Sequence, residues 1–147
     1  MFFGQFEHNI DAKGRLTIPF TFREQTPGGI FVTKGFDANL IAYSKQDYAQ
    51  IANNLSSLSI TDAESRSLRR MIFGNTAELG FDTAGRILIP AYLRDMAKIT
   101  NAVVLVGIGD SFEIWSVNSW SEQDTKINDS ETNSNRWAAF DISTRGK

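Results

Sequence analysis

The chain has 147 residues, of which 41% are hydrophobic, and its formal net charge at pH 7 is −2. It contains no cysteine and a single histidine, which excludes disulfide frameworks and thiolate metal sites. Its longest apolar run, Ala102 to Ile108, is far shorter than the roughly 18 residues of a membrane helix, and its start lacks the pattern of a signal peptide. We therefore expect a cytoplasmic protein with no membrane partner.

An internal repeat organises the sequence. Residues Asp11–Arg23 (DAKGRLTIPFTFR) and Asp82–Arg94 (DTAGRILIPAYLR) agree at six of thirteen positions, with a constant offset of 71. Self-similarity at a fixed offset indicates two copies of one structural unit, so we predict a first domain over residues 1–75 and a second over residues 76–122. Later matches at an offset of 72 pair Gly35 with Gly107, Tyr43 with Trp115, Ser44 with Ser116 and Tyr48 with Trp120.

Each copy is predicted to begin with a strand that leads into an Asp-x-x-Gly-Arg turn. A short alternating apolar strand follows, at Leu16–Ile18 in the first copy and at Ile87–Ile89 in the second. Pro19 and Pro90 come next. Each fits the first position of a short helix, because the N–H that proline lacks has no partner there.

A hairpin follows the short helix in each copy. It joins Ile30–Lys34 to Leu40–Tyr43 in the first copy and Ala102–Val106 to Phe112–Trp115 in the second. Glycine-containing stretches supply the turn chemistry between the strands. The aromatic residues that the repeat pairs are expected in the core or in an interface. Taken together, these elements predict a mainly β protein with short helices, of the α+β class.

Two longer helices are predicted in the first copy. Ser44 is expected to begin one of them, with Asp47 in the position of a capping box. Thr61 with Glu64 has the same spacing and is expected to cap a second helix that runs to about Phe73. This segment makes the first copy longer than the second.

Residues 123–147 are predicted to form a disordered tail. The first half of this segment is almost wholly polar, and such a composition cannot bury enough apolar surface to offset the entropy cost of ordering. Trp137, Phe140 and Ile142 form either a short docking motif or part of a loose end, and the composition favours the loose end.

The two turns hold the residues that we expect to carry the function. Aspartate accepts backbone N–H bonds in tight turns and glycine adopts positive φ, so these positions have a structural explanation. Arg15 and Arg86 have no packing reason to be cationic, and a guanidinium suits phosphate oxygens or the O6 and N7 of guanine. The alternative is an Asp–Arg ion pair within each turn. Lys13 stands beside the first arginine but Ala84 replaces it in the second copy, so the turns should contribute unequally.

The other polar candidates have simpler interpretations. Arg23 and Arg94 are expected near helix ends, where they complement the helix dipole or pair with the acidic residue that follows. The predicted helix at residues 61–73 carries three arginines, Arg66, Arg69 and Arg70. They form either a solvated face or contacts with phosphate or another subunit. His8 has no metal-ligand spacing around it, so we expect no metal.

An enzymatic function is the weakest interpretation of the sequence. Two symmetry-related aspartates, Asp11 and Asp82, resemble the pair of an aspartic protease, in which two carboxylates share a proton. Each is followed four residues later by an arginine, however, and a close cation lowers the pKa of a carboxyl group. No Gly-rich phosphate loop, nucleophile elbow or metal cluster is present in the sequence. We expect neither catalysis nor a cofactor.

With these motifs in place, the sequence resembles the MraZ family of bacterial transcriptional regulators. The resemblance lies in Met1–Arg15 (MFFGQFEHNIDAKGR), in Asp82–Pro90, and in Ile114–Ser116 followed by Trp120. It extends over residues 1–122 and leaves the tail outside.

The resemblance implies both a fold and a function. The fold is a pair of AbrB-like swapped-hairpin units that form a pseudo-twofold barrel, and the chains assemble into a ring-shaped homo-oligomer. The function is sequence-specific binding to direct repeats of double-stranded DNA, at the nucleoid, in the promoter of the division and cell-wall gene cluster that includes the regulator's own gene. The DNA-binding residues correspond to Lys13, Arg15 and Arg86. A ring presents many turns at once, which lets an acidic chain bind DNA multivalently. The alternative is a ring-forming structural protein that binds a partner but no DNA.

Overall fold

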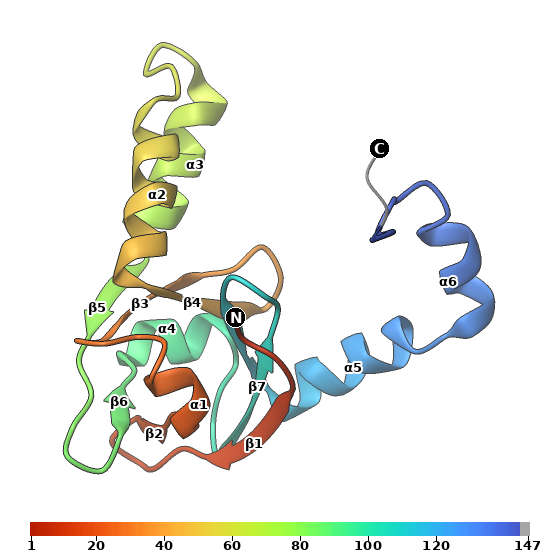
Figure 1. Cartoon of the computed structure of the whole chain (residues 1–147). Coiled ribbons are helices and arrows are strands. Elements are labelled where there is room, and N and C mark those ends of the chain that lie inside the picture. The colour runs from red at the N-terminus through yellow and green to blue at the C-terminus, as the bar shows by residue number, and fades with distance from the viewer. Residues whose placement is uncertain (145–147) are drawn as a thin grey trace.

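The computed structural model describes residues 1–144, in which antiparallel strands alternate with short helices (Figure 1). The predicted α+β class and both predicted hairpins, β3–β4 and β7–β8, are confirmed. In chain order the elements are β1 (Gln5–Asn9), β2 (Arg15–Thr17), α1 (Phe20–Arg23), β3 (Ile30–Lys34), β4 (Asn39–Ser44), α2 (Lys45–Ser56), α3 (Ala63–Phe73), β5 (Thr76–Leu79), β6 (Arg86–Leu88), α4 (Ala91–Met96), β7 (Ala102–Gly107), β8 (Phe112–Ser116), α5 (Val117–Ile127) and α6 (Ser130–Arg136).

The larger sheet exchanges strands between the two copies of the repeat. Its six strands are antiparallel neighbours in the order β1-β7-β8-β4-β3-β5. β1 of the first copy pairs with β7 of the second, and β5 of the second copy pairs with β3 of the first. The middle strands β4 and β8 pair with each other across the copies. This exchange is what the AbrB-like swapped-hairpin interpretation predicts, and it relates the copies by a pseudo-twofold axis.

The smaller sheet contains only β2 and β6, again one strand from each copy. Leu16 stands opposite Ile87 at its centre, and a bridge between Ile10 and Leu16 ties it to the end of β1. In the six-stranded sheet, β1 and β5 are opposite edges, and no ladder joins them within residues 1–144. The strand pairings therefore do not show the closed barrel that was expected.

Both copies contribute equivalent residues to the main hydrophobic core. These side chains form the main cluster, whereas a smaller buried cluster of Val104, Val106, Trp115 and Trp120 lies within the second copy alone. The boundary at residue 75 between two domains stays a prediction. The fully buried residues of the main cluster include Leu16, Ile18 and Phe22 from the first copy and their equivalents Ile87, Ile89 and Leu93 from the second.

The repeated aromatic residues pack in equivalent pairs beside α2 and α5. The ring centroids of Tyr43 and Tyr48 lie 6.2 Å apart, and those of Trp115 and Trp120 lie 5.6 Å apart. Three of the four rings are buried and Tyr43 is half-buried. Their predicted role as packing anchors is confirmed.

One helix cap is confirmed and one is wrong. The hydroxyl of Ser44 accepts the N–H of the third residue of α2 at 3.1 Å, as predicted. Helix α3, however, is capped by Asp62, whose carboxylate accepts the N–H of Ser65 at 3.0 Å. The hydroxyl of Thr61 lies instead 2.8 Å from that of Ser59. A carboxylate at the helix N-terminus also interacts favourably with the helix dipole, which an uncharged hydroxyl cannot do.

Each of the two prolines precedes its helix by one residue, whereas the sequence predicts each at the first position inside the helix. Pro19 has ψ 143° and Pro90 has ψ 146°, so both are extended N-cap residues. Their carbonyls accept the N–H groups of Arg23 and Arg94, at 3.0 and 3.1 Å. The prolines thus turn the chain from the short strands into α1 and α4.

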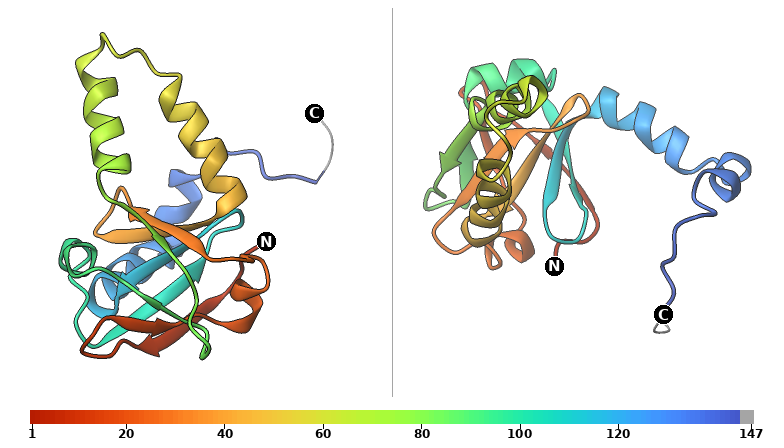
Figure 2. Two further views of the ribbon diagram at one scale, coloured as in Figure 1. Left: turned by 90° about the vertical axis from the view of Figure 1, so that its left-hand side faces the viewer. Right: turned by 90° about the horizontal axis from the view of Figure 1, so that it is seen from above.

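The C-terminal helices lead away from the sheet, whereas α2 and α3 rise from it as a helical hairpin (Figure 2). Helix α6 has no buried residue, and Trp137, Phe140 and Ile142 are exposed. The structure thus contains helices where the polar composition predicted no regular structure, yet α6 adds nothing to the core. Disorder of this tail in solution stays a prediction. No helix within residues 1–144 has the length and apolar character needed to cross a membrane.

Candidate nucleic-acid interface

The two Asp-x-x-Gly-Arg turns share one hydrogen-bond pattern. In the first, one carboxylate oxygen of Asp11 accepts the backbone N–H of Lys13 at 3.0 Å and that of Arg15 at 2.9 Å. The other oxygen accepts Nε of Arg15 at 2.6 Å. Asp82 makes the same three bonds within its own turn, each at 2.9 Å. The aspartates therefore have the structural role that the sequence predicted.

The glycines have the predicted backbone conformation. Gly14 has φ +92° and Gly85 has φ +76°, values that other residues adopt only at a cost. The N–H of each donates to the carbonyl of the aspartate that starts its turn, at 3.0 Å in both copies. The two copies of the motif therefore adopt the same turn geometry.

These hydrogen bonds also affect the ionisation of the aspartates. The pKa values of Asp11 and Asp82 are lowered, chiefly by the backbone N–H bond from the arginine of the same turn and further by the arginine side chain. Each carboxylate thus interacts with the arginine of its own turn, whereas an aspartic-protease pair depends on two carboxylates that share a proton.

The ion pair in each turn leaves part of the guanidinium free to bind something else. The bond to the aspartate uses Nε, and neither Nη atom of Arg15 or Arg86 donates a hydrogen bond to any part of residues 1–144. The two side chains are 39% and 34% exposed. The two interpretations of these arginines are therefore compatible: the carboxylate fixes one edge of the guanidinium, and the other edge keeps its donors.

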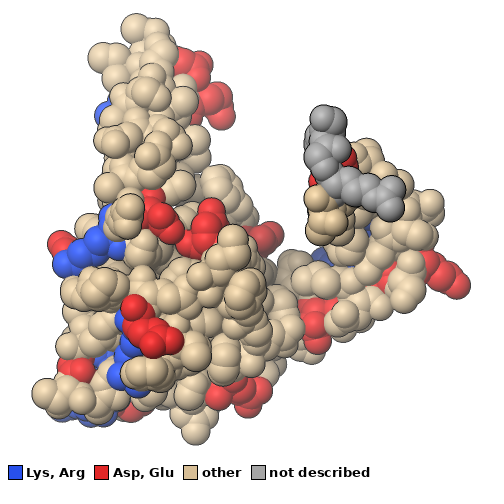
Figure 3. Space-filling view, in the orientation of Figure 1, with Lys and Arg blue, Asp and Glu red and all other residues tan. Residues whose placement is uncertain are grey.

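The β2–β6 pair brings the two turns together. Arg15 stands opposite Leu88, and Arg86 stands opposite Thr17. The arginines are therefore diagonal neighbours on the face opposite the core, and such residues have Cα atoms about 7–8 Å apart. Lys13 is exposed in the first turn. Lysine and arginine side chains gather over this corner of the molecule, at the lower left of Figure 3.

The three arginines of α3 lie away from this surface. Helix α3, which carries Arg66, Arg69 and Arg70, belongs to the hairpin at the opposite end of the molecule from β2 and β6 (Figure 1). Arg66 donates to the carbonyl of Ile60 at 2.8 Å. His8 is half-buried in β1. Within residues 1–144, no group of three His, Cys, Asp or Glu side chains could hold a metal ion.

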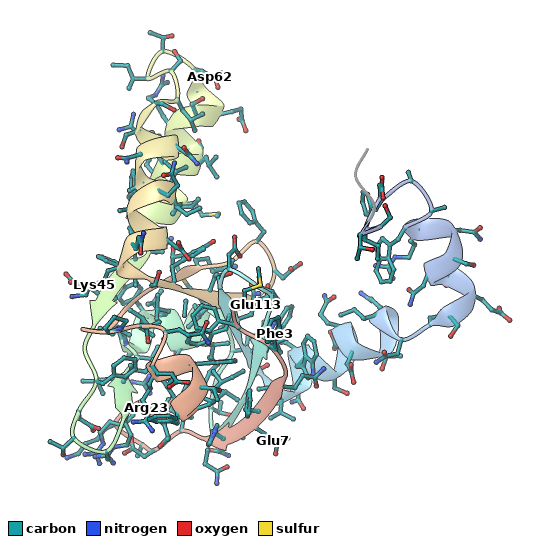
Figure 4. The ribbon with its side chains drawn as sticks, viewed as in Figure 1. Phe3, Glu7, Arg23, Lys45, Asp62 and Glu113 are labelled. Atoms are coloured by element: carbon teal, nitrogen blue, oxygen red, sulfur yellow. The ribbon has the colours of Figure 1, made fainter. Side chains whose placement is uncertain are left out.

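Arg23 and Arg94 have contacts that their positions in the sequence do not predict. Arg23 and Arg94 do lie in the last turns of α1 and α4. Their Nε atoms, however, donate to the carbonyls of Ile18 and Ile89, each at 3.0 Å, and neither forms an ion pair within residues 1–144. Figure 4 labels Arg23 beside α1, on the side of β6. Arg23 and Arg94 form one of the six identical pairs of the repeat, and this identity was the signal in the sequence that both copies use the arginine in the same way.

Comparison with known proteins gives the chain a family. The family model for the MraZ protein, whose description also calls the family antitoxin-like, matches residues 1–71 and 72–141. The chain is 42% identical over 120 residues to the transcriptional regulator MraZ of Herpetosiphon aurantiacus, covering 82% of this chain and 84% of the relative. It is 40% identical over 126 residues to that of Lactiplantibacillus plantarum, covering 86% and 89% of the two chains.

The similarity includes the C-terminal helices. The chain is 39% identical over 143 residues to the transcriptional regulator MraZ of Moorella thermoacetica, covering 97% of this chain and all of the relative. This alignment and the second family match both continue beyond residue 122, where the resemblance was expected to end. Two matched repeats, strand exchange between them and full-length similarity agree: the chain belongs to the MraZ family of transcriptional regulators.

Proposed function

We propose that this chain binds double-stranded DNA through its paired turns, with Lys13, Arg15 and Arg86 as the DNA-binding residues. It acts in the bacterial cytoplasm, at the nucleoid, on direct repeats in the promoter of the division and cell-wall gene cluster, its own gene included. One observation carries the proposal: the pairing of β2 with β6 puts both turn arginines on one exposed face.

The state of the two guanidinium groups suits recognition of DNA. Arginine binds phosphate through two parallel N–H donors and binds the O6 and N7 of guanine in the same way. The bond from Nε to the aspartate restrains Arg15 and Arg86 before any ligand arrives. A restrained side chain loses less rotamer entropy on binding, so the intra-turn ion pair assists binding.

Assembly into a ring-shaped homo-oligomer is part of the proposal. The proposal gives one chain three DNA-binding cations, and the net charge of the chain is −2, so one chain alone should bind DNA weakly. In a ring, several copies of the paired turns meet successive repeats of the same DNA. The second and later contacts are then intramolecular, and the overall affinity rises without any new kind of contact.

The proposal is tested by fluorescence anisotropy with the DNA upstream of the gene and a scrambled competitor. Arg15→Ala should weaken specific binding by about 1–3 kcal/mol for each base edge that the arginine reads, and Arg86→Ala should act in the same direction. Lys13→Ala should lower the salt dependence by about 0.9 for each phosphate that the lysine neutralises. Arg70→Ala on α3 is the matched control, because it removes an exposed arginine far from the turns.

Two results would contradict the proposal. If Arg15→Ala binds the promoter as tightly as the unaltered chain, the turns are not the reading surface. If no specific DNA binding is found but light scattering shows a species much heavier than the 16.4 kDa chain, the alternative of a ring-forming, partner-binding structural protein gains support. A monomer at micromolar concentration would refute the ring.

A further inference from the structure

The side chain of Arg94 crosses from the second copy to the turn of the first. A Cβ atom placed on Gly14 would lie 2.8 Å from Nε of Arg94 and 2.9 Å from its Cζ. The same Nε donates to the carbonyl of Ile89 at 3.0 Å. The N–H of Ile89 in turn donates to the carbonyl of Gly14 at 2.9 Å. The guanidinium therefore packs against the first turn and bonds to the residue that holds this turn.

The pseudo-twofold axis repeats this arrangement with the copies exchanged. A Cβ atom on Gly85 would lie 2.5 Å from Nη1 of Arg23 and 2.6 Å from its Cζ. Nε of Arg23 donates to the carbonyl of Ile18 at 3.0 Å, and the N–H of Ile18 donates to the carbonyl of Gly85 at 3.1 Å. Each turn is thus built from its own copy and held by an arginine of the other.

Neither arginine is explained by a charge partner. Both are half-buried, and neither forms an ion pair with a carboxylate within residues 1–144. Half-burying a guanidinium without a countercharge is costly. Cζ of Arg23 also lies 5.5 Å from the centroid of the Phe20 ring, but the contact that both side chains share is the close approach to the glycine of the opposite turn, which is possible because that residue has no Cβ.

We propose that Arg94 positions the first turn and Arg23 positions the second, so that the DNA-binding arginines Arg15 and Arg86 are each held in place by a residue of the opposite copy. The inference rests on the proposed DNA-binding function and deepens it. Arg94 acts on DNA recognition through Arg15, whereas Arg23 acts through Arg86. The repeat alone suggests the reverse, because Arg94 and Arg86 belong to the same copy.

Positioning of this kind matters because the two turns must fit DNA at the same time. A guanidinium makes a bidentate bond only over a narrow range of positions. Without Arg94, the first turn loses the group packed on Gly14, and the carbonyl of Ile89 loses a donor. The first turn then fluctuates, and Arg15 is held less well. The second turn keeps Arg23 and is unaffected.

The first measurement needs no DNA. Hydrogen exchange of the assembled full-length protein is followed by mass spectrometry for Arg94→Met, Arg23→Met and the unaltered chain. Arg94→Met should raise exchange by about threefold or more over residues 11–15 and leave residues 82–86 nearly unchanged, since exchange reports local opening. Arg23→Met should do the opposite. Equal effects on both turns, or an effect on the turn of the same copy alone, would overturn the proposal.

The second measurement is a double-mutant cycle on specific DNA affinity. Arg94→Met should weaken binding about three- to tenfold in the unaltered chain and in the Arg86→Ala variant, but hardly at all in the Arg15→Ala variant, because coupled residues are not additive. The salt dependence should stay unchanged. A fall of about 0.9 in that slope would show Arg94 to be a phosphate contact and overturn the positioning role.

The two measurements also separate the inference from the function on which it rests. If the unaltered chain does not bind its promoter, the proposed function fails, and hydrogen exchange alone decides whether the arginines hold the opposite turns. If the unaltered chain binds its promoter, and Arg94→Lys binds it as tightly whereas Arg94→Met does not, then a positive charge at residue 94 is sufficient and the positioning role is refuted.

Discussion

Replacing Gly14 with alanine tests how tightly the first turn is packed. The residue has φ +92°, and a side chain in the left-handed region costs about 1–2 kcal/mol. The new Cβ would also lie 2.8 Å from the carbonyl oxygen of Ile89 and 2.8 Å from Nε of Arg94. The arginine can move aside, but the carbonyl belongs to the backbone of the residue that holds the turn.

The expected magnitude follows from these two effects. Overpacking against backbone adds about 1–3 kcal/mol, so Gly14→Ala should destabilise the fold by about 2–5 kcal/mol in total. For a chain of this size one kcal/mol lowers the melting temperature by about 2–4 °C, which places the expected decrease between roughly 4 and 20 °C.

Two other glycines serve as controls for the melting experiment. Gly109 has φ +99° and no heavy atom within 4 Å of an added Cβ, so Gly109→Ala should show the backbone cost alone. Gly80 has open space and no positive φ, so Gly80→Ala should melt nearly as the unaltered chain does. Differential scanning calorimetry measures all three variants. If Gly14→Ala melts no lower than Gly109→Ala, the contacts around Gly14 add nothing to the backbone cost, and the inferred close packing of the turn is refuted.

Three further predictions concern charge, capping and the tail. The pKa values of Asp11 and Asp82 are lowered from 3.8, so their carboxylates stabilise the fold above about pH 4, and this stability is lost as the pH falls through the lowered values. Acid unfolding of a double variant with Asp11→Asn and Asp82→Asn should therefore depend less on pH in that range. An unchanged dependence would count against the hydrogen bonds of the turns. Ser44→Ala should cost about 1 kcal/mol in urea unfolding. Ser116→Ala should cost as much, because the Ser116 hydroxyl caps α5 by accepting the N–H of Ser119 at 3.1 Å. No change in either variant would mean that the caps are dispensable. Deleting residues 128–147 should leave the melting temperature nearly unchanged, whereas a large decrease would show that the tail docks on the body.

Local elements were predictable because they depend on short stretches of sequence. The repeat at Asp11 and Asp82 predicted two equal turns, and alternation of apolar residues predicted the strands around Leu16 and Ile87. The cap of α3 was placed at Thr61 because that residue has the expected spacing to a glutamate. Spacing could not show that the neighbouring Asp62 would take the position.

The arrangement of the two copies was not predictable from composition or spacing. Strand exchange depends on which edges meet after folding, and only the resemblance to a family indicated it. For the same reason the partners of Arg23 and Arg94 were missed. Each has an acidic neighbour in sequence, but the swapped sheets bring the turn of the other copy closer. A local pattern carries no information about contacts across the pseudo-twofold axis.

The unequal turns give the molecule a direction. A homodimer with a true twofold axis presents identical elements and reads a palindrome. Here the two halves are joined in one chain, which allowed Lys13 to stand in one turn while Ala84 stands in the other. Under the proposed function, a DNA segment that lies across both turns would meet a more basic end and a less basic end. Reversing the segment would exchange these ends, so its two orientations would not be equivalent, and successive sites along one duplex would be matched best when all of them point the same way.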